Sequence, residues 1–117
     1  MDRKALLEYA YDEFGAEPEY LWKRYPDFCV LRHGGNRKWF AVIMDVPAKS
    51  LGLDGEGKLP VLNVKCDPLL MGSLRKKPGF LPAYHMNKEQ WLSVLLGGAV
   101  PESEIKALLK LSFDLTK

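Results

Sequence analysis

A β-hairpin in the first half of the chain constrains the fold most strongly. Residues 28–33 and 38–46 are rich in β-branched and aromatic side chains, a composition typical of strands. Gly34, Gly35 and Asn36 lie between them, and these residue types tolerate the positive φ that a tight turn requires. The two segments are therefore predicted to pair as antiparallel strands, and an antiparallel sheet becomes the framework for the rest of the chain.

Three helices are predicted from capping residues and apolar spacing. The first starts at Asp2, runs to about residue 14 and ends at Gly15. The second starts at Asp67 and Pro68, an N-cap acceptor followed by the residue favoured at the first helical position. The third starts near Pro101 and carries an apolar stripe made of Ile105, Leu108, Leu109, Ser112 and Phe113.

Further strands complete the predicted sheet. Residues 60–66 and 91–96 are apolar runs, residues 21–25 form a short edge strand, and residues 51–57 form a mobile loop or wide turn. The order of elements is helix, three or four strands, short helix, strand, helix. This order predicts an α+β two-layer sandwich, in which helices cover one face of a mainly antiparallel sheet. A single domain over residues 1–117 is expected.

The stretch before the last strand combines a predicted turn over residues 79–82 with polar side chains that follow it. Asn87 is predicted to cap a short helical start, with Gln90 closing a capping box. His85, Asn87 and Lys88 would then place an imidazole, an amide and an ammonium group beside the edge of a core strand.

Composition limits the classes to which the chain can belong. The 117 residues are 47% apolar and 27% charged, which is ordinary for a globular protein and argues against disorder. No apolar run approaches the roughly 20 residues needed to cross a bilayer. The N-terminus has no apolar centre of the kind that a signal peptide requires. A cytoplasmic, monomeric protein without membrane contact is expected.

Positive charge is concentrated in two parts of the sequence, although the formal net charge is only +2. Residues 20–40 carry five basic groups and one acidic group, and residues 63–91 carry five basic groups and two acidic groups. If folding gathered both parts on one face, the local field would be far more positive than the total suggests.

Four patches of this sequence together resemble the MmcQ/YjbR family. They are residues 38–41, 62–68, 82–91 and 112–116. The residues that carry the resemblance are Lys38, Trp39, Phe40, Asn63, Lys65, Pro82, His85, Met86, Asn87, Lys88 and Trp91. The resemblance covers essentially the whole chain and implies a fold related to that of the bacterial frataxin CyaY. It also implies DNA binding through a double-wing arrangement of basic hairpins and loops.

The sequence offers candidates for a phosphate-directed surface of this kind. A non-enzymatic DNA-binding protein is expected, with salt-sensitive affinity and little base specificity. The candidate residues are Arg32, Asn36, Arg37, Lys38, Lys65, Arg75, Lys76, Lys77 and Lys88. Asn36, at the hairpin tip, is the one expected to reach a base edge. The alternative is a protein- or small-ligand-binding module with no nucleic-acid role.

Enzymatic and metal-binding functions have weaker support. Cys29 and Cys66 lie in apolar runs and outside any CxxC motif, so both are expected to be buried, reduced thiols. His85 with Cys66 is the one plausible catalytic pair, but no third group is evident to orient the imidazole. Neither a cofactor nor a metal site is expected.

Two further patterns have an ordinary structural explanation. The acidic residues Glu8, Asp12 and Glu13 have the spacing of a solvated helix face. The three tryptophans could serve as stacking platforms for single-stranded nucleic acid, but each lies in an apolar run, so packing in the core is preferred. They are Trp22, Trp39 and Trp91.

Overall fold

Five strands form one antiparallel sheet in the computed structural model, which describes residues 1–117. The strands are β1 (Cys29–Arg32), β2 (Trp39–Pro47), β3 (Lys58–Lys65), β4 (Phe80–Pro82) and β5 (Trp91–Leu95), in the spatial order β1-β2-β3-β5-β4. The predicted hairpin is confirmed as β1 and β2, and the His33 amide donates to the Lys38 carbonyl at 2.9 Å across its turn.

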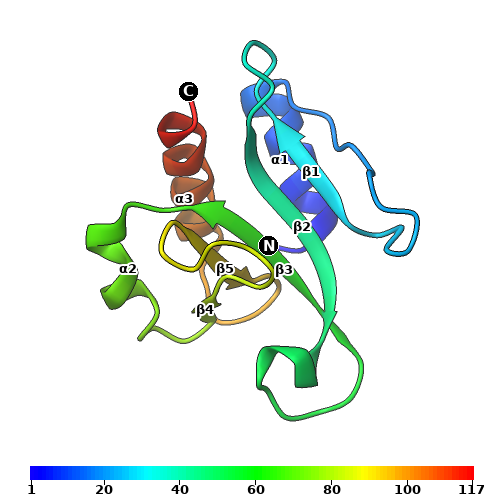
Figure 1. The fold of residues 1–117 in the computed structure, drawn as a ribbon, viewed down its shortest axis with the longest axis vertical. Coiled ribbons are helices and arrows are strands. Elements are labelled where there is room, and N and C mark those ends of the chain that lie inside the picture. The colour runs from blue at the N-terminus through cyan, green and yellow to red at the C-terminus, as the bar shows by residue number, and fades with distance from the viewer.

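Two of the three α-helices cover one side of this sheet. The helices are α1 (Arg3–Phe14), α2 (Pro68–Leu74) and α3 (Glu102–Leu115), and a single 3-10 turn, η1, spans Ala48–Leu51. Figure 1 shows α1 and α3 behind the sheet and α2 beside it, which confirms the predicted α+β sandwich. The predicted caps are present, since Asp2 accepts from the Ala5 amide at 2.8 Å and Asp67 from the Leu69 amide at 2.9 Å. None of the helices combines the length and the apolar character needed to span a membrane.

The two faces of the sheet are covered differently. On the helix face, Leu31, Ile43 and Leu62 pack with Leu6 of α1 and Leu109 of α3 in the main core. The opposite face, here called the open face, carries a smaller cluster made of Val30, Val42, Met44, Val46 and Val61. Residues 16–28 and the loop 83–90 cover only part of it (Figure 1).

A β-bulge at Phe40 determines which side chains reach the open face. Leu31 pairs with Ala41 and Arg32 pairs with Trp39, so Phe40 is the extra residue in β2. Phe40 and Ala41 both contribute to the main core, and Trp39 packs against the open-face cluster. Strict alternation would have placed Trp39 on the same face as Ala41.

Ser112 of α3 bonds the backbone groups beside this bulge. Its hydroxyl donates to the Phe40 carbonyl at 2.6 Å and accepts from the Lys65 amide at 2.8 Å. The Ser112 side chain is fully buried and satisfies two backbone groups of the sheet. The predicted apolar stripe of α3 therefore contains one hydroxyl that joins β2, β3 and the helix.

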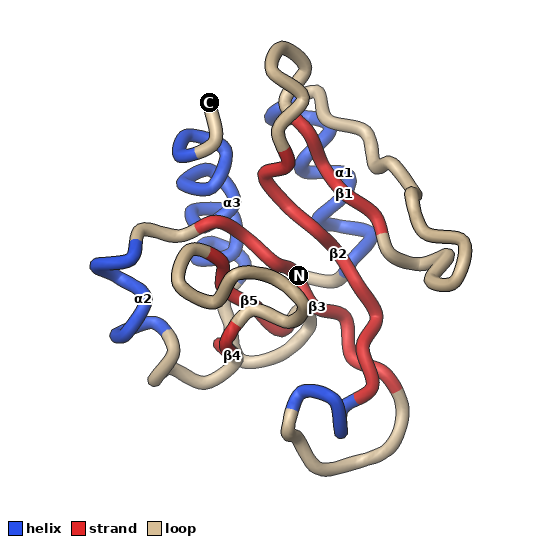
Figure 2. Tube along the Cα trace, in the orientation of Figure 1, coloured by secondary structure: helices blue, strands red, loops and turns tan.

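The edge strand predicted at residues 21–25 is wrong. Residues 15–28 are irregular, and only Glu19 forms a bridge, with Val30 (Figure 2). Pro18 and Pro26 flank the segment, and a proline has no amide to donate to a sheet. The chain instead crosses the open face and places Trp22 there.

The connection between α2 and β5 also differs from its prediction. Residues 80–82, expected to be a turn, form the short edge strand β4. The short helix expected at Asn87 is absent: the Asn87 side chain accepts from the Glu89 amide at 2.8 Å, which makes a turn. Because Trp91 enters β5 directly, no residues remain for a helix.

Candidate functional site

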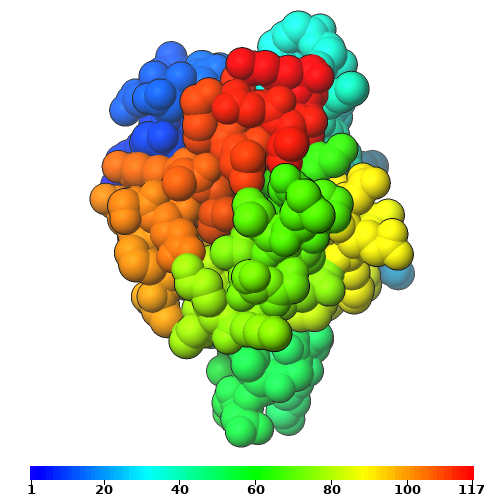
Figure 3. Space-filling model, turned by 90° about the vertical axis from the view of Figure 1, so that its left-hand side faces the viewer, coloured from blue at the N-terminus to red at the C-terminus, as the bar shows by residue number.

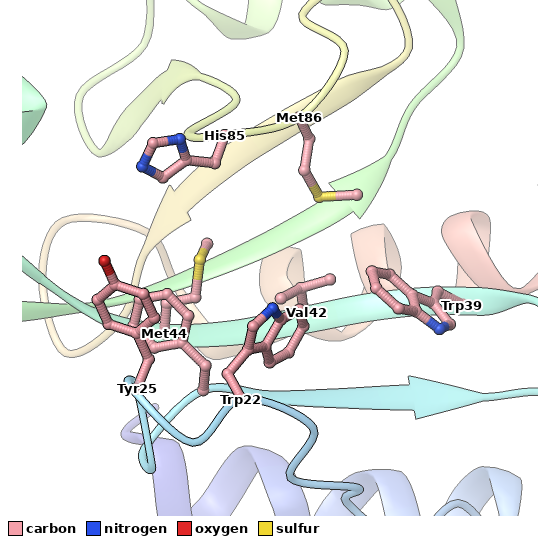
Figure 4. A pocket seen from close by; sticks show the side chains of 8 residues that line it. Trp22, Tyr25, Trp39, Val42, Met44, His85 and Met86 are labelled. Carbon is pink, nitrogen blue, oxygen red and sulfur yellow. The ribbon is translucent and has the colours of Figure 1, made fainter.

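The open face contains an apolar groove with a volume of about 320 Å³. Val42 and Met44 of β2 lie at its base, between residues 22–28 and the loop that carries His85 (Figure 4). Every lining side chain except His85 is apolar or aromatic; the set is Trp22, Tyr25, Phe28, Trp39, Val42, Met44, His85 and Met86. The groove is at the lower end of the size range of small-molecule sites, roughly 300–1,000 Å³.

Aromatic contacts build one wall of the groove. Tyr25 stacks on Phe28 with ring centroids 4.7 Å apart and an interplanar angle of 17°. Trp22 meets Phe28 and Trp39 edge-on, at 6.1 and 5.8 Å. These four rings hold one another in place, which orients the irregular segment without strand pairing. Tyr25 is still 51% exposed, so the wall is open to solvent.

A buried hydrogen-bond network anchors the loop that forms the other wall. Asn63 of β3 donates its amide to the Tyr84 carbonyl at 2.9 Å. The Ser93 hydroxyl of β5 accepts from the Tyr84 amide at 2.9 Å and donates to Asn63 Oδ1 at 2.5 Å. Both side chains are fully buried, so the backbone of Tyr84 has a fixed position. His85 follows it in the left-handed region, with φ 57°, and Met86 reaches the groove.

Cationic and aromatic side chains alternate across four strands at one end of the open face. Arg32 of β1 pairs with Trp39 of β2, and Lys65 of β3 pairs with Trp91 of β5. Because Ala41 pairs with Val64, Trp39 and Lys65 lie on adjacent strands at the same end of the sheet. All four side chains are half-buried, and the Arg32 guanidinium lies 5.9 Å from the centre of the Trp39 ring. We call these four residues the open-face row.

Comparison with known proteins identifies the family. A model of the YjbR family matches residues 14–115. The chain belongs to the YjbR family. It is 42% identical over 117 residues to the uncharacterised protein YyaQ of Bacillus subtilis, a match that covers all of this chain and 99% of YyaQ. It is 31% identical to the uncharacterised protein YbdF of Escherichia coli O157:H7 over 83% of this chain and 70% of YbdF.

Solved structures of similar proteins share the fold of this YjbR-family chain. A crystal structure of a Pseudomonas syringae protein is 45% identical and matches with a TM-score of 0.98, covering all of both chains. A crystal structure of a Deinococcus radiodurans protein, described as a DUF419 domain, is 25% identical with a TM-score of 0.74. That match covers 98% of this chain and 78% of the other.

The basic residues predicted for DNA contact are divided between separate places. Arg32, Arg37 and Lys38 lie at the β1–β2 hairpin, whereas Arg75, Lys76 and Lys77 follow α2 on the other side of the molecule (Figure 1). The β2–β3 loop projects at the end opposite the hairpin, with the C-terminal end of α3 near the hairpin (Figure 3). The single converged basic face on which the predicted surface depended is therefore absent.

Several of these cations have partners within the YjbR-family protein. Glu19 binds both Arg32 and Arg37, each at 3.1 Å. Lys77 pairs with Glu104 of α3, and Arg75 donates to the Lys88 carbonyl. The lysines without a carboxylate within 4.0 Å are Lys38, Lys65, Lys76 and Lys88 among those predicted.

Asn36, expected to reach a base edge, is instead bonded within the protein. Its amide donates to the Thr116 carbonyl at 3.1 Å, and its oxygen accepts from the Lys38 amide at 2.8 Å. The side chain thus closes the hairpin turn and holds the C-terminus beside it. No sequence pattern near Asn36 points to a partner 80 residues away.

The structure does not assemble the His85 and Cys66 pair. His85 is exposed and lines the groove on the open face, whereas Cys66 is buried in the main core beneath the helices. Burial raises the pKa of the Cys66 thiol, and the neighbouring Asp67 carboxylate raises it further. Burial also raises the pKa of Cys29, and the adjacent Arg3 only partly opposes this. Both thiols are free and buried, as expected.

The acidic residues of α1 are not part of a cluster of metal ligands. Glu8, Asp12 and Glu13 are exposed on α1, and nowhere do three histidine, cysteine, aspartate or glutamate side chains converge as metal ligands. Trp22 and Trp39 pack against the open-face cluster, as core packing predicts, but all three tryptophans are only half-buried. Tyr25 and Ser93 were not anticipated, since neither belongs to a motif and both act through contacts between distant segments.

Proposed function

We propose that this YjbR-family protein is a non-enzymatic nucleic-acid-binding protein, with DNA as its partner, and that it binds through the open face. The open-face row is the observation that carries the proposal. Arg32 and Lys65 supply cations that attract phosphates, and Trp39 and Trp91 supply flat rings beside them. Interleaved cations and partly exposed aromatic rings are typical of surfaces that track a nucleic-acid backbone and stack its bases.

The charges around the row support this assignment. Lys65 has no carboxylate partner, and Lys38 lies next to Trp39 at the exposed end of the hairpin. The Arg32 and Arg37 pairs with Glu19 are partly exposed, and such pairs are worth only about 0–1 kcal/mol. A phosphate can therefore replace Glu19 at little cost. The proposed binding surface is the open face of the sheet. It replaces the two basic wings that the family resemblance implied.

Salt dependence of binding to a short labelled DNA tests the proposal. Log affinity should fall linearly with log salt, because each phosphate contact releases a counterion. The Lys65→Ala substitution should weaken binding and reduce the slope by about 1. Lys4→Ala is the matched control, because Lys4 is exposed on α1 and unpaired. Absent or salt-insensitive binding would instead favour a protein- or small-ligand-binding module.

A further inference from the structure

We infer that the apolar groove receives an unpaired nucleobase, so that the protein binds single-stranded nucleic acid in preference to duplex. This inference rests on the proposed function and specifies its substrate. The groove is open, has aromatic rings along one side and is faced by His85 and Met86 on the other (Figure 4). A flat heteroaromatic ring buries both of its faces in such a space.

Continuity between the groove and the open-face row favours a base over an isolated apolar ligand. Trp39 belongs to both: it lines the groove and lies beside Arg32 in the row. A phosphate held by Arg32 or Lys65 would place the attached sugar beside Trp39, with its base directed toward the groove. An uncharged apolar ligand would make no use of these cations.

Charge around the groove is complementary to a phosphate chain. Lys23 and Arg24 are exposed and lie between Trp22 and Tyr25 on the aromatic wall, and neither has a carboxylate partner. Asp27 is the one acidic residue in that wall, and its carbonyl accepts from Arg3. The segment that forms the wall therefore carries more basic than acidic residues.

A base in a duplex must leave its stack to enter the groove. The bases of a duplex are stacked and paired, and extruding one costs a few kcal/mol. In a single strand the bases are already available, and stacking on protein aromatics contributes about 1–3 kcal/mol per base. Polar side-chain atoms at the groove are few: they are the His85 imidazole, the Tyr25 hydroxyl and the indole N–H groups of Trp22 and Trp39. Sequence preference should therefore be small.

An abasic oligonucleotide isolates the contribution of the groove without changing the protein. An oligothymidine single strand and an abasic strand of equal length carry the same phosphates, so their salt slopes should agree. The thymidine strand should bind at least about fivefold more tightly, as expected for stacking of one base. It should also bind more tightly than a duplex of the same length.

A protein variant locates this preference in the groove. Tyr25→Ser should remove most of the preference for thymidine over abasic strand and leave the salt slope unchanged. Tyr11→Ser is the matched control, because Tyr11 is 57% exposed on α1, away from the open face. Thermal melting of both variants verifies that they fold.

The outcomes separate the two proposals. Equal binding of thymidine and abasic strands, or loss of the preference with Tyr11→Ser as well as Tyr25→Ser, would overturn the groove inference while salt-dependent binding still supported the proposed function. Failure of every strand to bind, with a free apolar compound bound in the groove instead, would overturn both.

Discussion

The imidazole of His33 lies 2.7 Å from the hydroxyl of Thr116, although the two residues are 83 positions apart in sequence. The Thr116 hydroxyl also lies 2.8 Å from the Ser112 carbonyl, so it links the His33 ring to the last turn of α3. The ring also packs on Phe113, with centroids 4.1 Å apart. This contact fixes the end of α3 to the hairpin that carries Arg32 and Trp39 of the open-face row.

Protonation of His33 should destabilise the fold. Burial lowers the pKa of His33 below its ordinary value of 6.5, so the unfolded chain takes up a proton at a higher pH than the folded protein. The free energy of unfolding should therefore fall as pH drops below about 6.5. Urea midpoints measured from neutral pH to about 5 should show this fall in the wild type and a smaller one in His33→Gln.

His85→Asn is the control for this experiment. His85 is exposed and has a positive φ, which asparagine tolerates, so its replacement should keep the wild-type pH dependence. If the pH profile of His33→Gln matched that of the wild type, the loss of stability at low pH would not arise from the His33–Thr116 contact.

Removing the Ser112 hydroxyl should cost a large share of the stability. Ser112→Ala leaves the Phe40 carbonyl and the Lys65 amide without their partner inside the core, at about 1–3 kcal/mol for each group. Denaturant unfolding of Ser112→Ala measures the loss. Ser103→Ala, on the exposed side of α3, corrects for the gain in helix propensity from alanine. A difference within about 0.5 kcal/mol of that control would mean that the bulge does not depend on this hydroxyl.

Both cysteine thiols should react slowly in the folded protein. Burial raises the pKa of Cys29 and of Cys66, and the thiolate is the reactive form. Alkylation followed by mass spectrometry should label neither residue at neutral pH until denaturant is added. Rapid labelling of Cys66 in the native state, absent from Cys66→Ser, would contradict its burial and revive a catalytic role.

Release of the two arginines held by Glu19 should strengthen DNA binding. Glu19→Gln removes the carboxylate that pairs with Arg32 and Arg37, so both guanidiniums become available to phosphates. Affinity for a single strand should rise, and its salt slope should steepen by about 1.4, at about 0.7 for each new phosphate contact. Glu17→Gln removes the same charge from an exposed, unpaired position and should have a smaller effect. Equal effects of the two variants would indicate a general charge effect in place of release of the arginines.

Sequence predicted the elements that depend on local interactions. The β1–β2 hairpin, the Asp2 and Asp67 caps and the end of α1 at Gly15 are set by neighbouring residues, and all are confirmed. Asn87 illustrates the limit of such signals, because the same side chain suits a helix cap and a turn. The turn forms because β5 begins at Trp91 and leaves no residues for a helix.

The candidate site could not be predicted in the same way, because it depends on contacts between distant segments. The bulge at Phe40 places Trp39 on the open face, opposite to the face that strict alternation predicts. No local sequence pattern indicates a bulge. Glu19 pairs with both Arg32 and Arg37, and no local pattern distinguishes it from the other acidic residues near the N-terminus. The tryptophans of the groove and the row look like core residues in sequence, since half-buried and buried aromatics occupy similar apolar runs.

Binding of nucleic acid by the open face is tested by the salt dependence of single-strand binding, compared between wild type and Lys65→Ala. We expect a linear fall of log affinity with log salt and a shallower fall for Lys65→Ala, with Lys4→Ala matching wild type. No measurable binding at low salt, or identical slopes for all three proteins, would contradict the open face as a nucleic-acid interface.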